Sequence, residues 1–296
     1  MTLSSKGRGF PALRAAALVL LMLPLAACET VTDLIPTSLF SSKGPKSDIG
    51  PDEPAERLFN DGLARLQDKR YEDAVKKFTE LDKQYPYSGW SRRALLLQTF
   101  ASYENGDYSE AISHGRRFVQ LHPANPDAAY AQYLVGMSYF NQIPDVTRDQ
   151  ERSEKALTVM DELIRRWPAS EYAPDAKQRV SVARDQLAGR EMEVGRFYLN
   201  KRNYTGAINR FREVIVKYQT TRHTEESLAR LAEAYMALGI VNEAQTAGAV
   251  LGHNFPDSRW YKDTYSLLQS GGVEPREDAG SWISRIFRGA GKTIGL

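Results

Sequence analysis

The chain has few of the residues on which catalytic and metal-binding sites are usually built. Its 296 residues include one cysteine, Cys28, and four histidines, so no intrachain disulfide can form. No two histidines stand at the H-x-x-x-H spacing of a zinc site. The G-x-S-x-G nucleophile motif, the P-loop and the dinucleotide-binding glycine fingerprint are also missing. We therefore expect no enzyme, no metal and no cofactor, and a fold stabilised by packing alone.

A short apolar run near the N-terminus points to export. It covers 13 residues, 15–27, whereas a helix needs about 20 residues to span a bilayer. Three basic residues precede it, as in a secretory signal. The run ends in Leu25-Ala-Ala-Cys28, which resembles a bacterial lipobox. We expect residues 1–27 to be a lipoprotein signal peptide and Cys28 to receive a diacylglycerol thioether and an amino-terminal acyl chain. The alternative is an ordinary signal peptide whose cleavage site precedes a cysteine.

The residue after the cysteine bears on the membrane to which the protein is sorted. Asp at that position favours inner-membrane retention in the enterobacterial sorting rule, and this chain has Glu29. Several acyl chains give stable anchoring where one gives only marginal binding. We therefore expect a protein anchored by lipid at the periplasmic face of the outer membrane.

The charge of the exported chain excludes bulk electrostatic binding to nucleic acid. The signal holds three of the 39 basic residues and none of the 37 acidic ones, so the mature chain carries 36 against 37, a net charge of −1. Proteins that bind nucleic acid nonspecifically need a basic excess or stripe. Residues 28–52 follow the signal, rich in proline, glycine and serine, and are expected to be a flexible tether.

From Ala55 onward the chain repeats itself. In the first unit, Gly62, Ala74, Phe78 and Pro86 stand at positions 8, 20, 24 and 32, the landmarks of a tetratricopeptide repeat. Small residues let the two helices of a hairpin approach closely, a large one fills the groove, and proline ends the second helix. Further units start near residues 92, 129, 188 and 225. The pattern predicts an all-α, right-handed α-solenoid of about five repeats and about eleven helices.

Two departures from the repeat organise the chain into halves. An eight-residue insertion, within 141–153, separates the two helices of the third unit. An amphipathic stretch after Glu171 is expected to run on to about Leu199 as one long helix, which Gly189 could break. We expect an N-terminal half at 53–168 with repeats 1–3, and a C-terminal half at 169–269 with the long helix, repeats 4–5 and a cap.

Aromatic residues cluster at the turn between the first two units. Tyr85, Tyr87 and Trp90 fall within six residues around Pro86, and the repeat itself demands neither Tyr87 nor Trp90. Packing between repeats is one interpretation. The other is a partly exposed ledge, formed by these three aromatics, that grips a client peptide.

The last segment, 270–296, is expected to be a flexible tail. Trp282, Ile283, Ile286 and Phe287 recur at helical spacing within it, and three basic residues follow the last acid, Asp278. It is interpreted either as a loosely packed tail or as a short amphipathic basic element that docks on a partner or on anionic head groups.

Several phrases of the repeat region resemble those of the BamD family, also called ComL, of outer-membrane assembly lipoproteins. They lie at 85–88, 117–123, 130–136, 168–172, 193–198, 207–210 and 255–258. The resemblance implies five repeats in two halves and membership of the β-barrel assembly (BAM) complex. It implies that the N-terminal half binds unfolded barrel proteins near Tyr85–Ser88. It also implies that the C-terminal half binds the BamA subunit, with Arg210 at the contact.

One rival function uses the same fold. A periplasmic repeat lipoprotein could instead act as an adaptor that organises peptidoglycan synthesis or cell division. The ComL name also points to DNA uptake, but the net charge of −1 argues against direct DNA binding.

Overall fold

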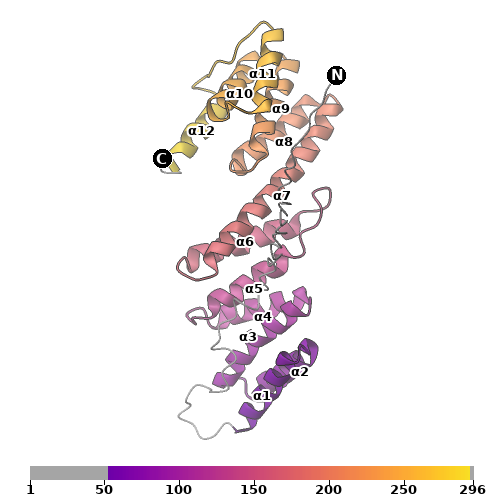
Figure 1. Cartoon of the computed structure of the whole chain (residues 1–296), viewed down its shortest axis with the longest axis vertical. Coiled ribbons are helices and arrows are strands. Elements are labelled where there is room, and N and C mark those ends of the chain that lie inside the picture. The colour runs from indigo at the N-terminus through magenta and orange to yellow at the C-terminus, as the bar shows by residue number, and fades with distance from the viewer. Residues whose placement is uncertain (1–52, 294–296) are drawn as a thin grey trace, which may run out of the picture. The chain divides into compact units, whose positions relative to one another are not determined.

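A computed structural model describes residues 53–293, and the regular structure of these residues is entirely helical (Figure 1). Twelve helices lie in this range, and they form one compact unit. The signal peptide, Cys28 and the tether lie outside the described residues. The helices are α1 (Glu53–Gln67), α2 (Tyr71–Gln84), α3 (Gly89–Glu104), α4 (Tyr108–Leu121), α5 (Ala128–Phe140), α6 (Glu151–Arg166), α7 (Ala173–Asn200), α8 (Tyr204–Lys217), α9 (Thr224–Ala237), α10 (Val241–Asn254), α11 (Arg259–Ser270) and α12 (Trp282–Thr293).

The helices pack in chain order, as a solenoid requires. Each helix from α1 to α10 packs on the next, and the first helices of successive hairpins also touch, α1 on α3, α3 on α5 and α5 on α7. The helix α11 packs on both α9 and α10 and closes the fifth hairpin. This arrangement confirms the predicted all-α fold of tetratricopeptide repeats.

The small and large landmark residues pack against each other within each hairpin. A Cβ on Gly62 would overlap the ring of Phe78, and one on Gly195 would overlap the ring of Phe211. In the third repeat, a Cβ on Gly136 would lie 2.6 Å from the sulfur of Met160. Met160 therefore takes the large position, displaced by the eight inserted residues. These contacts explain why the glycines tolerate no side chain.

The helix α7 is continuous over 28 residues, so Gly189 does not break it. The insertion between α5 and α6 packs along this helix. Gln186 Nε2 donates to the carbonyl of Pro144 at 2.7 Å, and Arg190 donates to the carbonyl of Thr147 at 3.1 Å. A Cβ on Gly189 would lie 3.3 Å from Val146. The glycine thus makes room for the insertion.

The C-terminal segment packs against the C-terminal half, which contradicts our expectation of a loosely packed tail. Ile283 of α12 is fully buried and belongs to the same apolar cluster as α8, α9 and α10. Trp282 Nε1 donates to the hydroxyl of Tyr235 at 3.1 Å, and Ser281 donates to Glu243 at 2.7 Å. Helices α8 and α10 both contact α12, so its apolar face has a protein surface to cover.

Candidate functional site

The structure brings two groups of the predicted site residues to two separate clefts. The first, the N-terminal cleft, has a volume of about 550 Å³ and lies between the α2–α3 turn and the end of α4. Ser88 shapes its rim, because its hydroxyl caps α3 by accepting the Ser91 N–H at 3.0 Å. The residues that line it are Asp82, Pro86, Tyr87, Ser88, Gly89, Ser91, Arg92, Leu95, Arg117, Leu121 and His122.

The three aromatics of the predicted ledge have different environments. Tyr87 is fully exposed at the cleft, and Tyr85 is half-buried at the C-terminus of α2. Trp90 is only 7% exposed, and its ring lies 4.8 Å from the ring of Phe59 on α1. The expectation that Trp90 forms part of an exposed ledge is therefore wrong. Leu121, 55% exposed on the opposite rim, supplies the second apolar side chain of the cleft.

Two arginines of the N-terminal cleft differ in how they are paired. Arg117 forms an ion pair with Asp82 at 2.7 Å, and Asp82 also accepts a hydrogen bond from Ser91. The Nε of Arg92 is buried and has no hydrogen-bond partner among the described residues. Burial raises the pKa of Asp127 and the charge of Arg92 opposes this rise, but the two side chains form no ion pair. Arg92 is thus a cation of the cleft without an ion-pair partner among residues 53–293.

His122 lies beside these arginines. Burial lowers the pKa of His122 below its ordinary value, and the charges of Arg92 and Arg117 lower it further. The ring is therefore mainly neutral at pH 7, and the positive charge of the cleft comes from its arginines. The cleft combines exposed apolar side chains with an unpaired guanidinium.

The second cleft, the α7–α8 cleft, has a volume of about 700 Å³ and contains Arg210. Arg210 lies on α8, as the repeat pattern predicts, and its Nη1 donates to Glu191 of α7 at 3.2 Å. Lys217 and Glu213 form a second ion pair at 2.5 Å. The lining residues are Glu191, Tyr198, Asn203, Gly206, Asn209, Arg210, Arg212, Glu213, Val216 and Lys217.

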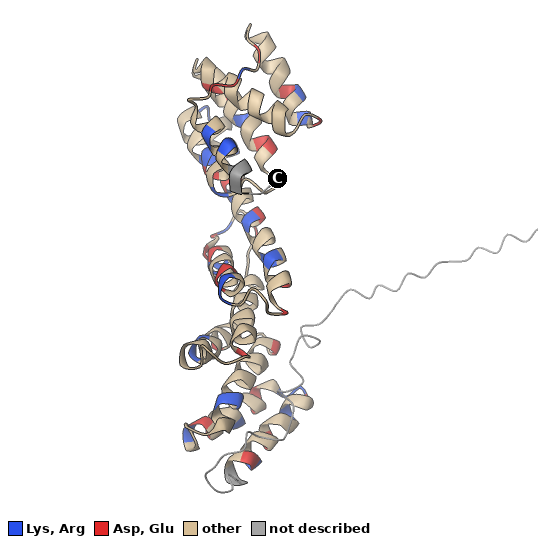
Figure 2. Ribbon diagram, turned by 90° about the vertical axis from the view of Figure 1, so that its left-hand side faces the viewer, with Lys and Arg blue, Asp and Glu red and all other residues tan. Residues whose placement is uncertain are grey.

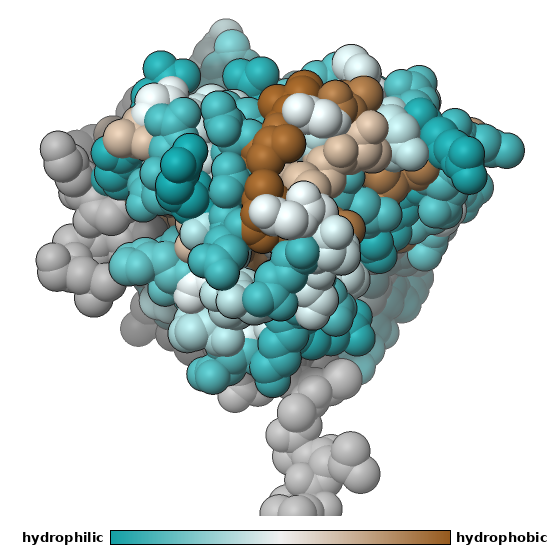
Figure 3. Space-filling model, turned by 90° about the horizontal axis from the view of Figure 1, so that it is seen from above, coloured by the Kyte–Doolittle hydropathy of each residue, from teal (hydrophilic) through white to brown (hydrophobic). Residues whose placement is uncertain are grey.

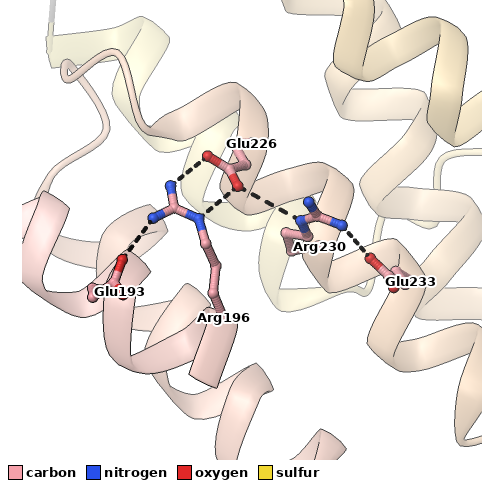
Figure 4. A network of polar contacts seen from close by, with 5 residues as sticks. All are labelled: Glu193, Arg196, Glu226, Arg230 and Glu233. Carbon is pink, nitrogen blue, oxygen red and sulfur yellow. Dashed lines mark hydrogen bonds and ion pairs between the residues drawn. The ribbon is translucent and has the colours of Figure 1, made fainter. Parts of the chain in front are cut away.

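A five-residue ion network joins α7 to α9 (Figure 4). Arg196 binds both carboxylate oxygens of Glu226, at 2.8 and 2.7 Å, and Glu193 at 3.3 Å. Arg230 lies 3.6 Å from Glu226 and donates to Glu233 at 2.8 Å. Burial alone would raise the pKa of Glu226, but the hydrogen bonds and charge of Arg196 hold it below its ordinary value. The network joins α7, the first helix of the fourth repeat, to α9, the first helix of the fifth.

Both signs of charge are interspersed along the helices (Figure 2). No cluster of three or more metal-binding side chains occurs in residues 53–293. Among the helices of this range, none combines the length and apolar character that crossing a bilayer requires. Apolar side chains gather in a patch on the face seen in Figure 3. Leu238 and Ile240, beside the turn between α9 and α10, are each 43% exposed.

The fold and its clefts define a helical repeat protein of the tetratricopeptide type. A family model described as "YfiO: Outer membrane lipoprotein" matches residues 51–251. A protein of Caulobacter vibrioides, named outer membrane protein assembly factor BamD, is 46% identical over 76% of this chain and 73% of its own length. A protein of the same name from Rickettsia prowazekii is 41% identical over 73% of this chain and 86% of its own length. The chain belongs to the BamD family of outer membrane lipoproteins.

Among solved structures, the yeast Sti1 TPR2AB domain in complex with an HSP90 peptide aligns with a TM-score of 0.38. That alignment has 14% identity and covers 75% of this chain and 85% of the Sti1 chain. This similarity is too low to compare binding sites.

Proposed function

We propose that this chain is the lipid-anchored scaffold subunit of the BAM complex, which folds and inserts β-barrel proteins into the outer membrane. The relatives from Caulobacter vibrioides and Rickettsia prowazekii are both named outer membrane protein assembly factor, which supports this function. The family's description as outer membrane lipoproteins supports a lipid anchor on Cys28. In this proposal the N-terminal half, 53–168, binds unfolded clients, and the C-terminal half, 169–269, binds the BamA subunit.

The N-terminal cleft is the proposed client site, and one observation carries this proposal. Arg92, a cation without an ion-pair partner among residues 53–293, lines the same cleft as two exposed apolar side chains, Tyr87 and Leu121. Extended peptides are recognised by pockets for their side chains, and chain ends by groups that bind the terminal carboxylate. Arg92 suits a carboxylate because a guanidinium binds it with paired N–H groups. We propose that the cleft binds the C-terminal segment of an unfolded barrel protein.

The α7–α8 cleft is the proposed contact with BamA. Half of its lining residues are charged, and four of these form ion pairs, which suits a protein surface better than a small apolar ligand. Charged groups at such a contact set orientation and partner choice. Arg210, 44% exposed, is available to a partner despite its pair with Glu191.

Photo-crosslinking tests the client site. A peptide with the C-terminal strand of a barrel protein should crosslink to the wild-type chain and about tenfold less to Tyr87→Ala, because contact aromatics carry much of the binding energy. Asp107→Ala, an exposed change in the next hairpin, is the matched control. Equal crosslinking of all three proteins would show that the client site lies elsewhere.

Purification from detergent-solubilised envelopes tests membership of the complex. Recovery of BamA supports the proposal, and recovery of cell-wall synthases alone supports the peptidoglycan or division adaptor. Cys28→Ala should abolish incorporation of a fatty-acid probe, since Cys28 is the chain's one cysteine. Equal label on both proteins would contradict the lipid anchor.

A further inference from the structure

We propose that the C-terminal helix α12 supports the α7–α8 cleft through one of the residues that line it, Arg212. Its Trp282 positions Arg212 as an unpaired cation, and an acidic side chain of the partner binds there. This inference rests on the proposed role of the cleft in binding BamA. It adds a second contact residue, Arg212, and a positioning residue, Trp282.

The α7–α8 cleft has one more cation than it has carboxylates. Three cations and two carboxylates line it, and two ion pairs, Arg210–Glu191 and Lys217–Glu213, account for all but Arg212. Arg212 is exposed, and no carboxylate of the described residues lies within ion-pair distance of it. The cleft therefore presents net positive charge at Arg212.

An aromatic ring holds this cation in place. The guanidinium of Arg212 lies 5.1 Å from the ring centre of Trp282, a cation–π contact. Stacking on a ring face leaves the N–H edges of a guanidinium free to bind a carboxylate with two hydrogen bonds. Arg212 is thus presented to a partner with less rotamer entropy to lose than a freely moving arginine has.

The position of Trp282 is itself determined by the fold. Its indole donates to Tyr235 at 3.1 Å, and the next residue, Ile283, is fully buried. The nearest acid on that side, Glu243, accepts a hydrogen bond from Ser281. Trp282 is therefore fixed by α9 and α10 while its ring supports α8.

The segment before α12 is bound along its length. The side-chain amide of Gln245 on α10 donates to the carbonyl of Glu274 at 2.7 Å. The backbone carbonyl of Gln245 accepts the N–H of Arg276 at 3.3 Å. The N–H of Asp278 donates to Thr246 at 3.2 Å. These contacts lead the chain from α11 back to α8. The segment 274–278 and α12 lie beyond residue 251, where the family match ends, whereas the residues of α8 and α10 that they contact lie within it.

Binding to BamA tests the inference. Full-length lipidated protein and full-length BamA, both in detergent, are titrated with Arg212→Gln and Arg212→Glu. We expect affinity to fall about threefold for Arg212→Gln and about tenfold for Arg212→Glu, because charge reversal adds repulsion to a lost pair. Added salt should weaken the wild-type complex more than that of Arg212→Gln, because salt screens exposed charges.

Arg259→Glu is the matched control, because Arg259 is an exposed arginine 4.7 Å from a tryptophan ring, on α11 and outside the cleft. It should bind as wild type does. Trp282→Phe keeps a ring face and should retain affinity, whereas Trp282→Leu keeps apolar packing without a ring and should lose about threefold. Trp282→Leu should add no further loss in the Arg212→Gln background, since coupled residues are not additive.

The outcomes separate the inference from the proposed function. Loss with Arg210→Glu but wild-type binding by Arg212→Glu overturns the inference alone. Wild-type binding by both variants overturns the proposed role of the cleft. A loss with Trp282→Leu that persists in the Arg212→Gln background shows that α12 acts through stability, which also overturns the positioning role.

Discussion

The N-terminal cleft and the α7–α8 cleft are built on the same kind of helical hairpin but balance their charges differently. In the first, exposed Tyr87 and Leu121 line the cleft together with Arg92, which has no ion-pair partner among the described residues. In the second, ion pairs occupy most of the charged groups, and the remaining cation stacks on Trp282. The first arrangement suits a chain end, and the second suits a folded surface. The repeat sets where a cleft lies, and a few side chains decide what it can bind.

The largest expected effect separates Tyr87 from Trp90. Trp90→Ala should lower the free energy of unfolding by about 3–5 kcal/mol, because it empties a buried site against Phe59. Tyr87→Ala should leave stability nearly unchanged, because the side chain is fully exposed. Thermal and urea unfolding measure both. A Trp90→Ala protein that unfolds like the wild type would contradict the packing role.

A second effect would sharpen the difference between the clefts. Arg92→Gln should weaken binding of a peptide with a free C-terminal carboxylate by about 1.5–3 kcal/mol, the range for hydrogen bonds to charged groups. The same peptide with a C-terminal amide should bind both proteins equally weakly. Fluorescence anisotropy with the two peptides measures this, and Arg117→Gln shows whether the cation already paired to Asp82 contributes. Equal loss with both peptides would exclude carboxylate recognition.

A third effect concerns the second cleft. Arg210→Glu should weaken co-purification with BamA about tenfold and more than Arg210→Ala does, because the reversed charge faces Glu191 and the partner. Glu191→Gln releases Arg210 from its pair and should bind BamA at least as well as the wild type. If Arg210→Glu and Arg210→Ala bind normally, Arg210 is not at the contact.

The smallest effect is a pH dependence of stability. Burial lowers the pKa of His114, opposed by Glu110, so the folded state binds this proton less readily than the unfolded state. The ordinary histidine pKa is about 6.5, so stability should fall as pH drops below that value. His114→Gln should flatten the change in melting temperature between pH 7.5 and 5.5. An unchanged slope would assign the dependence to other groups.

The residues that were predictable from the sequence act over short distances along the chain. Gly62 and Phe78 lie 16 positions apart in one hairpin, and the same spacing recurs at Gly195 and Phe211, so periodicity predicted both contacts. For Trp90 the sequence left packing between repeats and an exposed ledge both open, because its burial depends on Phe59 of the preceding hairpin.

The charges that matter at the clefts depend on pairs far apart in the chain. Arg212 and Trp282 are 70 positions apart, and nothing in their local patterns brings them together. The amphipathic spacing of residues 282–287 predicted a helix but could not tell which surface its apolar face covers. The sequence could not predict that Arg92 is without an ion-pair partner, since this is a property of the folded structure.

The number of residues in α7 also sets the rotation of one cleft relative to the other about the helix axis. This helix is continuous and packs on α5 and α6 of the N-terminal half and on α8 of its own C-terminal half, so it joins the two halves. Each residue of an α-helix turns the chain by about 100° and advances it by about 1.5 Å. Adding one residue near Gly189 would therefore rotate one cleft about the helix axis relative to the other, whereas adding about 18 residues, five full turns, would restore the phase. An insertion or deletion in α7 would therefore change the relative orientation of the two binding faces without altering a residue of either.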